Sequence, residues 1–247
     1  MVKLRKSWPL LVSVLSPICQ VVFIFALFWF SDAVVKRFTP GHRFWLDLNF
    51  SAWNLFVLPA MAAIVSELSW AQDRDASIWR HLLHQPVSRV KQYLAKTANH
   101  FLLFFISLSL VFGLVFIGGL ILQKNPEFLM MQMQTKLFFQ FYAYSFLASL
   151  PVVAFTTWFS FRFPGPGMAL GAALVGSWAS MKLIGITSLV QMLPWGLSCH
   201  AATTFERWRF ALPWDYCFGS MFLTIALVVF GAIDFSKLAY TKSLERN

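Results

Sequence analysis

The longest uncharged stretch of the sequence runs from Thr97 to Gln123 and reads TANHFLLFFISLSLVFGLVFIGGLILQ. A helix needs about 20 apolar residues to cross a hydrocarbon core about 30 Å thick, so this stretch is long enough to span a membrane. Other charge-free runs of comparable length are Ser7–Ser31, Leu48–Ser66, Leu137–Phe161, Phe163–Met181 and Tyr216–Ile233. The sequence therefore predicts six membrane-spanning helices.

The composition agrees with this interpretation. Apolar residues make up 58% of the 247 residues and charged residues 12%, whereas soluble domains have about 45–50% and about 25%. The 28 Phe and 11 Trp residues exclude a disordered chain, and 3 Cys residues exclude a disulfide scaffold. We expect an all-α integral membrane protein whose single domain, 1–247, has spans at about 10–31, 48–70, 97–122, 137–161, 167–190 and 216–235.

The distribution of positive charge predicts the orientation. The first run is longer than the apolar part of a secretory signal, about 7–15 residues, so we expect it to remain as a span. With the N-terminus and C-terminus in the cytoplasm, the inner segments hold 12 of the 20 Lys and Arg residues and the outer segments 7. The net charge of +10 then suits anionic lipid headgroups rather than nucleic acid.

Two segments next to spans have distinctive patterns. Before the first span, apolar and cationic side chains alternate, which is typical of an interfacial helix: Lys3, Leu4, Arg5, Lys6 and Trp8. Between the last two spans, Gln191–Asp215 is rich in Trp and Pro. This composition fits an aromatic belt at the outer interface, whereas the family resemblance given below implies short re-entrant helices there.

The connection between spans 2 and 3, Asp73–Lys96, is the longest expected cytoplasmic segment. Its apolar residues recur at the spacing of one helical face: Ile78, Trp79, Leu82 and Leu83. Asp73 and Asp75 suit the N-terminus of such a helix, and Pro86 must interrupt it. Ser88 is expected to cap a second helix that continues into span 3.

The string from Asp73 to Arg89, DRDASIWRHLLHQPVSR, resembles the corresponding loop of type-2 ABC transporter permeases, most of all the lantibiotic-immunity permeases. Tyr93 and Lys96 fit the same pattern, whereas Asp73 stands where that family usually has Glu. The resemblance implies a coupling helix that docks on an ATP-binding subunit through Asp73, Asp75, Ile78, Trp79, Leu82, Leu83, Pro86 and Arg89. It also implies a second permease copy, identical or related.

Nucleotide chemistry is expected on the partner subunit. The sequence has no G-x-x-x-x-G-K-[ST] loop, so we expect ATP and Mg²⁺ to bind the ATP-binding subunit and this chain to hold no cofactor and no metal. His81 and His84 lack a third ligand at suitable spacing, and we assign them no role. The chain itself is therefore not expected to be an enzyme.

Two charged residues near or within spans are candidates for a translocation path. Lys182 can line the path, pair with a carboxylate, or extend its stem to the surface. For Glu67 we expect a contact with Arg74 or with the coupling helix. Glycines from Gly167 to Gly176 in span 5 can serve a dimer interface or packing within the subunit.

These observations favour a permease subunit of an ATP-driven exporter for an amphipathic, membrane-active peptide such as a lantibiotic. Spans 1, 2 and 5 are expected to line the path. Two alternatives remain: a membrane enzyme that acts on a lipid-linked substrate through Asp73 and Asp75, and a membrane sensor or anchor that transports nothing.

Overall fold

The computed structural model describes residues 8–30, 41–74, 88–122, 135–165, 167–183, 193–207 and 214–244. These residues form helices. The helices are α2 (Trp8–Phe30), α4 (Gly41–Ala52), the π-helical turn η1 (Trp53–Val57), α5 (Leu58–Asp73), α7 (Arg89–Leu122), α8 (Thr135–Arg162), α9 (Met168–Leu183), α11 (Pro194–Arg207) and α12 (Trp214–Leu244). The described part of the chain is all-helical, as the sequence predicts.

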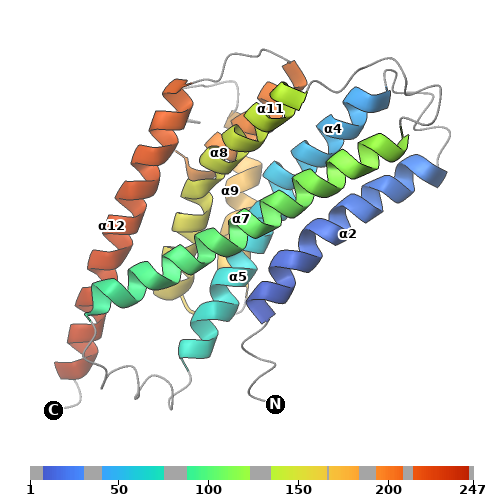
Figure 1. The fold of residues 1–247 in the computed structure, drawn as a ribbon. Helices are drawn as coiled ribbons and strands as arrows, with labels where there is room; N and C mark the ends of the chain where they lie inside the picture. The colour runs from blue at the N-terminus through green and yellow to red at the C-terminus, as the bar shows by residue number, and fades with distance from the viewer. Residues whose placement is uncertain are drawn as a thin grey trace.

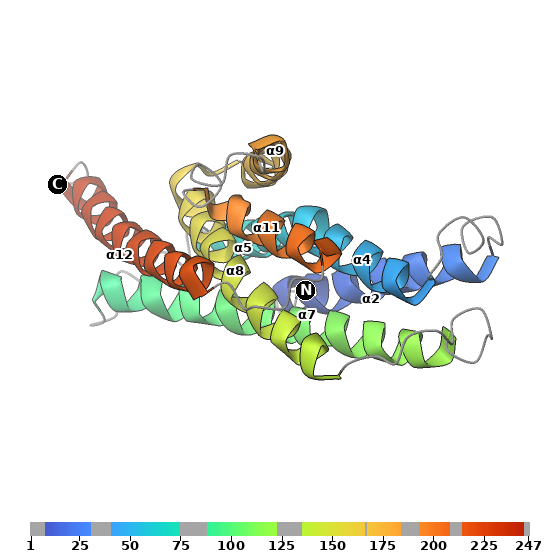
Figure 2. The ribbon, with the colours of Figure 1, turned by 90° about the horizontal axis from the view of Figure 1, so that it is seen from above.

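The long helices run side by side and alternate in direction (Figure 1). The first turns of α2 and α7 and the last turns of α5 and α12 lie at the bottom of that view, which we call the basal end; the opposite end is the distal end. Figure 2 shows α7 along one side of the bundle and α9 on the other, with α5, α8 and α11 between them. Helix α8 packs against α5, α7, α11 and α12, so it is central to the bundle.

Five stretches are long and apolar enough to cross a membrane: Trp8–Trp29, Trp45–Asp73, Arg89–Leu122, Phe138–Arg162 and Trp214–Lys237. They coincide with five of the six predicted spans. The predicted span 167–190 corresponds to α9, a shorter apolar helix of 16 residues, and to residues 184–190, which lie outside the described part. The sixth span therefore stays a prediction.

The distribution of apolar side chains fits a bundle surrounded by lipid. Large apolar residues cover its outer surface, among them Phe23 of α2, Val175 of α9 and Phe222 of α12, which are 65%, 66% and 76% exposed. Such a contiguous apolar exterior is unfavourable in water. Inside, Phe50 of α4, Phe112 of α7 and Phe141 of α8 pack ring against ring, with the Phe50 and Phe112 centroids 4.6 Å apart.

The second crossing is interrupted by η1, where the helix widens for one turn. A π turn weakens the regular hydrogen-bond ladder, and side-chain amides donate to backbone oxygens just before it. Asn54 Nδ2 donates to the carbonyl of Phe50 at 2.9 Å, and Gln20 Nε2 of α2 donates to the carbonyl of Asn49 at 2.8 Å. The wide turn is thus held from within its own helix and from α2.

Within the segment 191–215, the structure describes α11, which packs into the bundle against α8, α9, α4 and η1. In its first turn, the Trp195 ring lies against Gly176 of α9 and against the ring of Phe155 of α8, 4.8 Å away between centroids. A Cβ on Gly176 would lie 2.5 Å from the Trp195 ring. The α11 part of the segment therefore lies inside the bundle, and Gly176 serves packing within the subunit.

The turn between α8 and α9 depends on one glycine. Gly167 has φ of 89°, a left-handed conformation that side chains disfavour. The backbone N–H of Met168 donates to the carbonyl of Gly165 at 3.2 Å, which closes the turn. Helix α9 consequently starts at the basal end, close to Arg162, where α8 stops.

Candidate functional site at the basal end

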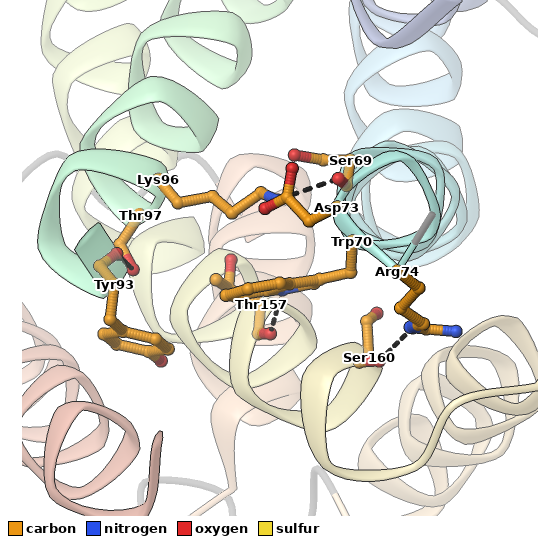
Figure 3. Close-up of polar contacts among 9 residues, drawn as sticks. All are labelled: Ser69, Trp70, Asp73, Arg74, Tyr93, Lys96, Thr97, Thr157 and Ser160. Carbon is orange, nitrogen blue, oxygen red and sulfur yellow. Dashed lines mark hydrogen bonds and ion pairs between the residues drawn. The ribbon is translucent and has the colours of Figure 1, made fainter. Parts of the chain in front are cut away.

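The helices on either side of segment 75–87 are joined by an ion pair. Lys96, two turns into α7, reaches across to the carboxylate of Asp73 in the last turn of α5 (Figure 3). The same ammonium donates to the backbone carbonyl of Ser69 at 2.8 Å. The side chains of Lys96 and Asp73 are 13% and 29% exposed, so water screens this pair only partly.

Trp70 lies under this ion pair and extends the connection to α8. The Lys96 ammonium is 4.1 Å from the centroid of the Trp70 ring, a cation–π distance. The indole Nε1–H of Trp70 donates to the carbonyl of Thr157 at 2.9 Å. Figure 3 shows the indole between Lys96 on one side and Thr157 on the other. One aromatic residue therefore connects α5, α7 and α8.

Arg74, directly after α5, makes a second connection to α8. Its Nη2 donates to the carbonyl of Ser160 at 2.7 Å, and its Nη1 is 3.1 Å from Oε1 of Glu67. The predicted contact between Glu67 and Arg74 is thus confirmed. The guanidinium is thus bound to Glu67 within α5 and to α8 through the Ser160 carbonyl, although the Arg74 side chain is 36% exposed.

Aromatic packing extends the site to α12. Trp70 packs against Tyr93 of α7, Phe161 of α8 and Phe235 of α12, with centroid separations of 5.4–6.3 Å. The Tyr93 ring fits against Gly231 of α12, where any Cβ would collide with the phenol. We use the name basal cluster for the residues in Figure 3: Ser69, Trp70, Asp73, Arg74, Tyr93, Lys96, Thr97, Thr157 and Ser160.

A cleft of about 270 Å³ lies beside the basal cluster, lined by Ser69, Trp70, Gln72, Asp73, Gln92, Lys96 and Phe235. Its walls come from α5, α7 and α12. In the same last turns of α8, Trp158 Nε1 donates to Asp234 of α12 at 3.0 Å, and Arg162 lies 3.9 Å from the same carboxylate. Polar contacts therefore join four helices at this end of the bundle.

Of the candidates for the coupling helix and the translocation path, the structure describes Glu67, Asp73, Arg89 and Lys182. Asp73 pairs with Lys96, and Arg89 is the first residue of α7. The other proposed coupling residues, Asp75, Ile78, Trp79, Leu82, Leu83 and Pro86, lie outside the described residues, as do His81, His84 and the expected interfacial helix up to Ser7. The predicted cap is confirmed, because Ser88 Oγ accepts from the Lys91 backbone N–H at 3.4 Å.

Glu67 and Lys182 lie apart. Ala63 of α5 packs against Ala169 and Ala173 near the start of α9. Glu67 is one turn further towards the basal end, whereas Lys182 is in the last turn of α9. The Lys182 side chain is exposed, and its ammonium lies 5.9 Å from the centroid of the Trp178 ring on the outer surface.

Sequence reasoning missed the pairing of Asp73 with Lys96 and the role of Trp70. One signal was available: Lys96 is the last charge before the uncharged run of span 3, and Asp73 is the first charge after the predicted span 2. Opposite charges at the facing ends of two consecutive antiparallel spans lie at the same membrane depth. The acceptors on α8 are backbone carbonyls, which leave no sequence signal.

Long apolar helices with an apolar exterior, and a polar cluster confined to one end, define a multi-pass membrane protein. Residues 1–180 match the family model described as ABC-2 family transporter protein. The chain belongs to this family. It is therefore the membrane permease subunit of an ABC transporter and not the ATPase, and the family implies an ATP-binding ABC subunit as its partner. The searches of curated proteins and of solved structures found no match.

Proposed function

We propose that this chain is the permease of an ATP-driven exporter in a bacterial inner membrane, with both termini in the cytoplasm, and that its basal end receives force from the ATP-binding subunit. The observation that supports this most is the connection of α5 to α7 through Asp73, Lys96 and Trp70. These helices flank segment 75–87. A displacement of that segment would therefore move both helices together.

The length of α7 supports the same proposal. Its 34 residues correspond to about 51 Å at 1.5 Å per residue, well beyond the hydrocarbon core of about 30 Å. The first turns, with Arg89 and Lys96, thus extend from the membrane towards the expected partner. In this proposal Asp75, Ile78, Trp79, Leu82, Leu83 and Pro86 form the docking helix, and ATP and Mg²⁺ bind only the partner subunit.

The proposed cycle needs two permeases, either identical or related. Closure of the ATP-binding subunits pushes the docking helix, tilts α5 and α7, and opens a path between the permeases lined by α2, α5 and α9. Glu67 lies near the basal end of this path. Lys182 lies on the exposed face of α9, where it can meet the second permease or substrate.

A groove between α7 and α8 supports an amphipathic substrate. It has a volume of about 400 Å³ and lies in the distal half of the bundle, lined by Ser109, Phe112, Gly113, Phe116, Phe138, Phe139 and Tyr142. Its polar feature is a hydroxyl pair, Ser109 Oγ and Tyr142 OH, 2.8 Å apart. An aromatic groove with two hydroxyls, open on the membrane side, suits a membrane-active peptide of the lantibiotic or bacteriocin type, and the proposed role is immunity to it.

Co-expression with candidate ATP-binding subunits tests the coupling proposal. We expect the complex to co-purify, and the Trp79→Ala, Leu82→Ala double variant to lose most of its substrate-stimulated ATP hydrolysis. Lys91→Ala, an exposed position on α7, is the control and should resemble the wild type. Failure of any ATP-binding subunit from the same genome to co-purify would contradict the proposal and favour the enzyme or anchor alternatives.

Gly113 offers a direct test of the groove. A Cβ at this position meets nothing within 4 Å, so Gly113→Leu fills the groove without disturbing the bundle. Gly219→Leu on α12 is the matched control, because it is equally exposed and equally unobstructed. We expect Gly113→Leu alone to reduce the survival of cells challenged with a panel of lantibiotic peptides. Equal survival of both variants and the wild type would exclude the groove as a substrate site.

A further inference from the structure

His100, one turn beyond the basal cluster on α7, has a defined hydrogen-bonding role on one side of its ring. It is 2% exposed, and its Nδ1 is 2.9 Å from the hydroxyl of Thr157 on α8. That hydroxyl already donates its proton to the carbonyl of Val153 at 2.7 Å. A hydroxyl has one proton, so Thr157 must accept from His100, and Nδ1 must carry the hydrogen.

The other ring nitrogen must then be an acceptor. Burying a charge without compensation costs far more than burying a neutral polar group, so the neutral imidazole fits this position. With the proton on Nδ1, Nε2 presents a lone pair. Among the described residues Nε2 has no hydrogen-bond partner, and the same is true of Ser66 Oγ on α5, which is 1% exposed.

Both unpartnered atoms belong to residues that line one cavity. This cavity has a volume of about 10 Å³ and lies between α2, α5, α7 and α8, lined by Ser13, Met61, Ala62, Val65, Ser66, His100, Phe104 and Val153. The smallest space that holds a water molecule is about 10–15 Å³ on this measure. Apart from Ser13, the rest of the lining is apolar, and it contains no carboxylate, so it does not suit a metal cation.

We propose that this cavity binds one water molecule, which joins His100 to Ser66. The water donates to His100 Nε2 and accepts from the Ser66 hydroxyl. Its second proton can go to Ser13 Oγ, whose own proton is donated to the carbonyl of Pro9 at 2.8 Å. Three partners are the usual number for a buried water.

The water completes a polar chain through the basal half of the bundle. The chain runs from Lys96 over Trp70 to Thr157, whose carbonyl accepts from Trp70 and whose hydroxyl accepts from His100. It then returns through the water to Ser66 on α5. His100 is thus a positioning residue that ties α7 to α8 directly and to α5 through water, independently of what the transporter moves.

Nuclear magnetic resonance of the full-length chain, labelled with ¹⁵N-histidine and embedded in lipid bilayers, tests the proposal. The chain has 5 His residues, and the signals lost in His100→Gln identify this one. We expect the hydrogen on Nδ1 and a cross-peak between Nε2 and water protons. A hydrogen on Nε2, or no water cross-peak in the wild type, would overturn the proposal without involving any variant.

Two serine variants sharpen the test. Ser66→Val fills the cavity and should abolish the water cross-peak while Nδ1 keeps its hydrogen, because Thr157 is unchanged. Ser149→Ala is the matched control, since its buried hydroxyl donates within α8 to the carbonyl of Ser145; its His100 signals should match the wild type. A water cross-peak that persists in Ser66→Val would place the water elsewhere and refute the assignment.

Discussion

Replacing Lys96 by Met should destabilise the bundle strongly, because three interactions of the ammonium are lost at once. Two of these are the hydrogen bond to the Ser69 carbonyl and the contact with the Trp70 ring. Charged hydrogen bonds are worth about 1.5–3 kcal/mol and cation–π contacts about 0.5–2 kcal/mol. The third loss leaves the Asp73 carboxylate, 29% exposed, without its partner.

These contributions overlap, so we expect a net loss of about 3 kcal/mol in the free energy of unfolding, between the values for surface and buried ion pairs. For a chain of this size that corresponds to a fall of about 6–12 °C in Tm. Asp73→Asn should cost less, about 1–2 kcal/mol, because Lys96 keeps the Ser69 carbonyl and the Trp70 ring. The exposed Lys91→Met is the control and should stay within about 0.5 kcal/mol of the wild type.

Thermal and denaturant unfolding of the purified chain in mild detergent would complete a double-mutant cycle. We expect the Lys96→Met, Asp73→Asn double variant to be about 1–2 kcal/mol more stable than the sum of the single effects, because the isolated carboxylate is then absent. A coupling energy below about 0.5 kcal/mol would refute the reasoning. The ion pair would then add nothing to the contacts of Lys96 with the Ser69 carbonyl and the Trp70 ring.

Two further predictions concern aromatic packing. Trp70→Phe keeps a ring but loses the hydrogen bond to Thr157, so thermal unfolding should show a loss of about 1 kcal/mol in the free energy of unfolding. Trp70→Ala should cost about 3–5 kcal/mol. Equal losses in the two variants would show that packing of the ring is not the main contribution of Trp70 to stability. Gly118→Ala should lower Tm because its Cβ would lie 2.7 Å from the Trp45 ring, whereas Gly113→Ala on the same helix should leave Tm unchanged or raise it.

The sequence predicted the membrane helices well because charge-free length is a local property. The predicted span 97–122 lies within α7. Ser88 caps the start of this helix, as expected for a serine at that position. The Glu67 contact with Arg74 could also be predicted, because residues seven apart lie on one helical face. Local patterns were sufficient in each case.

The remaining features depend on contacts between helices that sequence patterns do not encode. The carbonyls of Thr157 and Ser160 accept from Trp70 and Arg74 only because α8 lies beside α5. Nothing in the residues Trp53–Val57 indicates a π turn, since its geometry is stabilised by an amide on another helix. The sequence therefore predicts the spans but not how their side chains meet.

The π turn η1 also separates the length of the second crossing from its rotational phase. Each residue of an α-helix advances the chain by about 100° around the axis, but a π turn takes in one residue more than an α turn for nearly the same rotation. The faces that carry Trp70 and Asp73 therefore keep their direction although Trp53–Val57 holds one extra residue. Deleting one residue within Trp53–Val57 would return this turn to α geometry and leave α5 facing the same way, whereas the loss of one residue without such a bulge to absorb it would turn the faces that follow by about a quarter of a revolution.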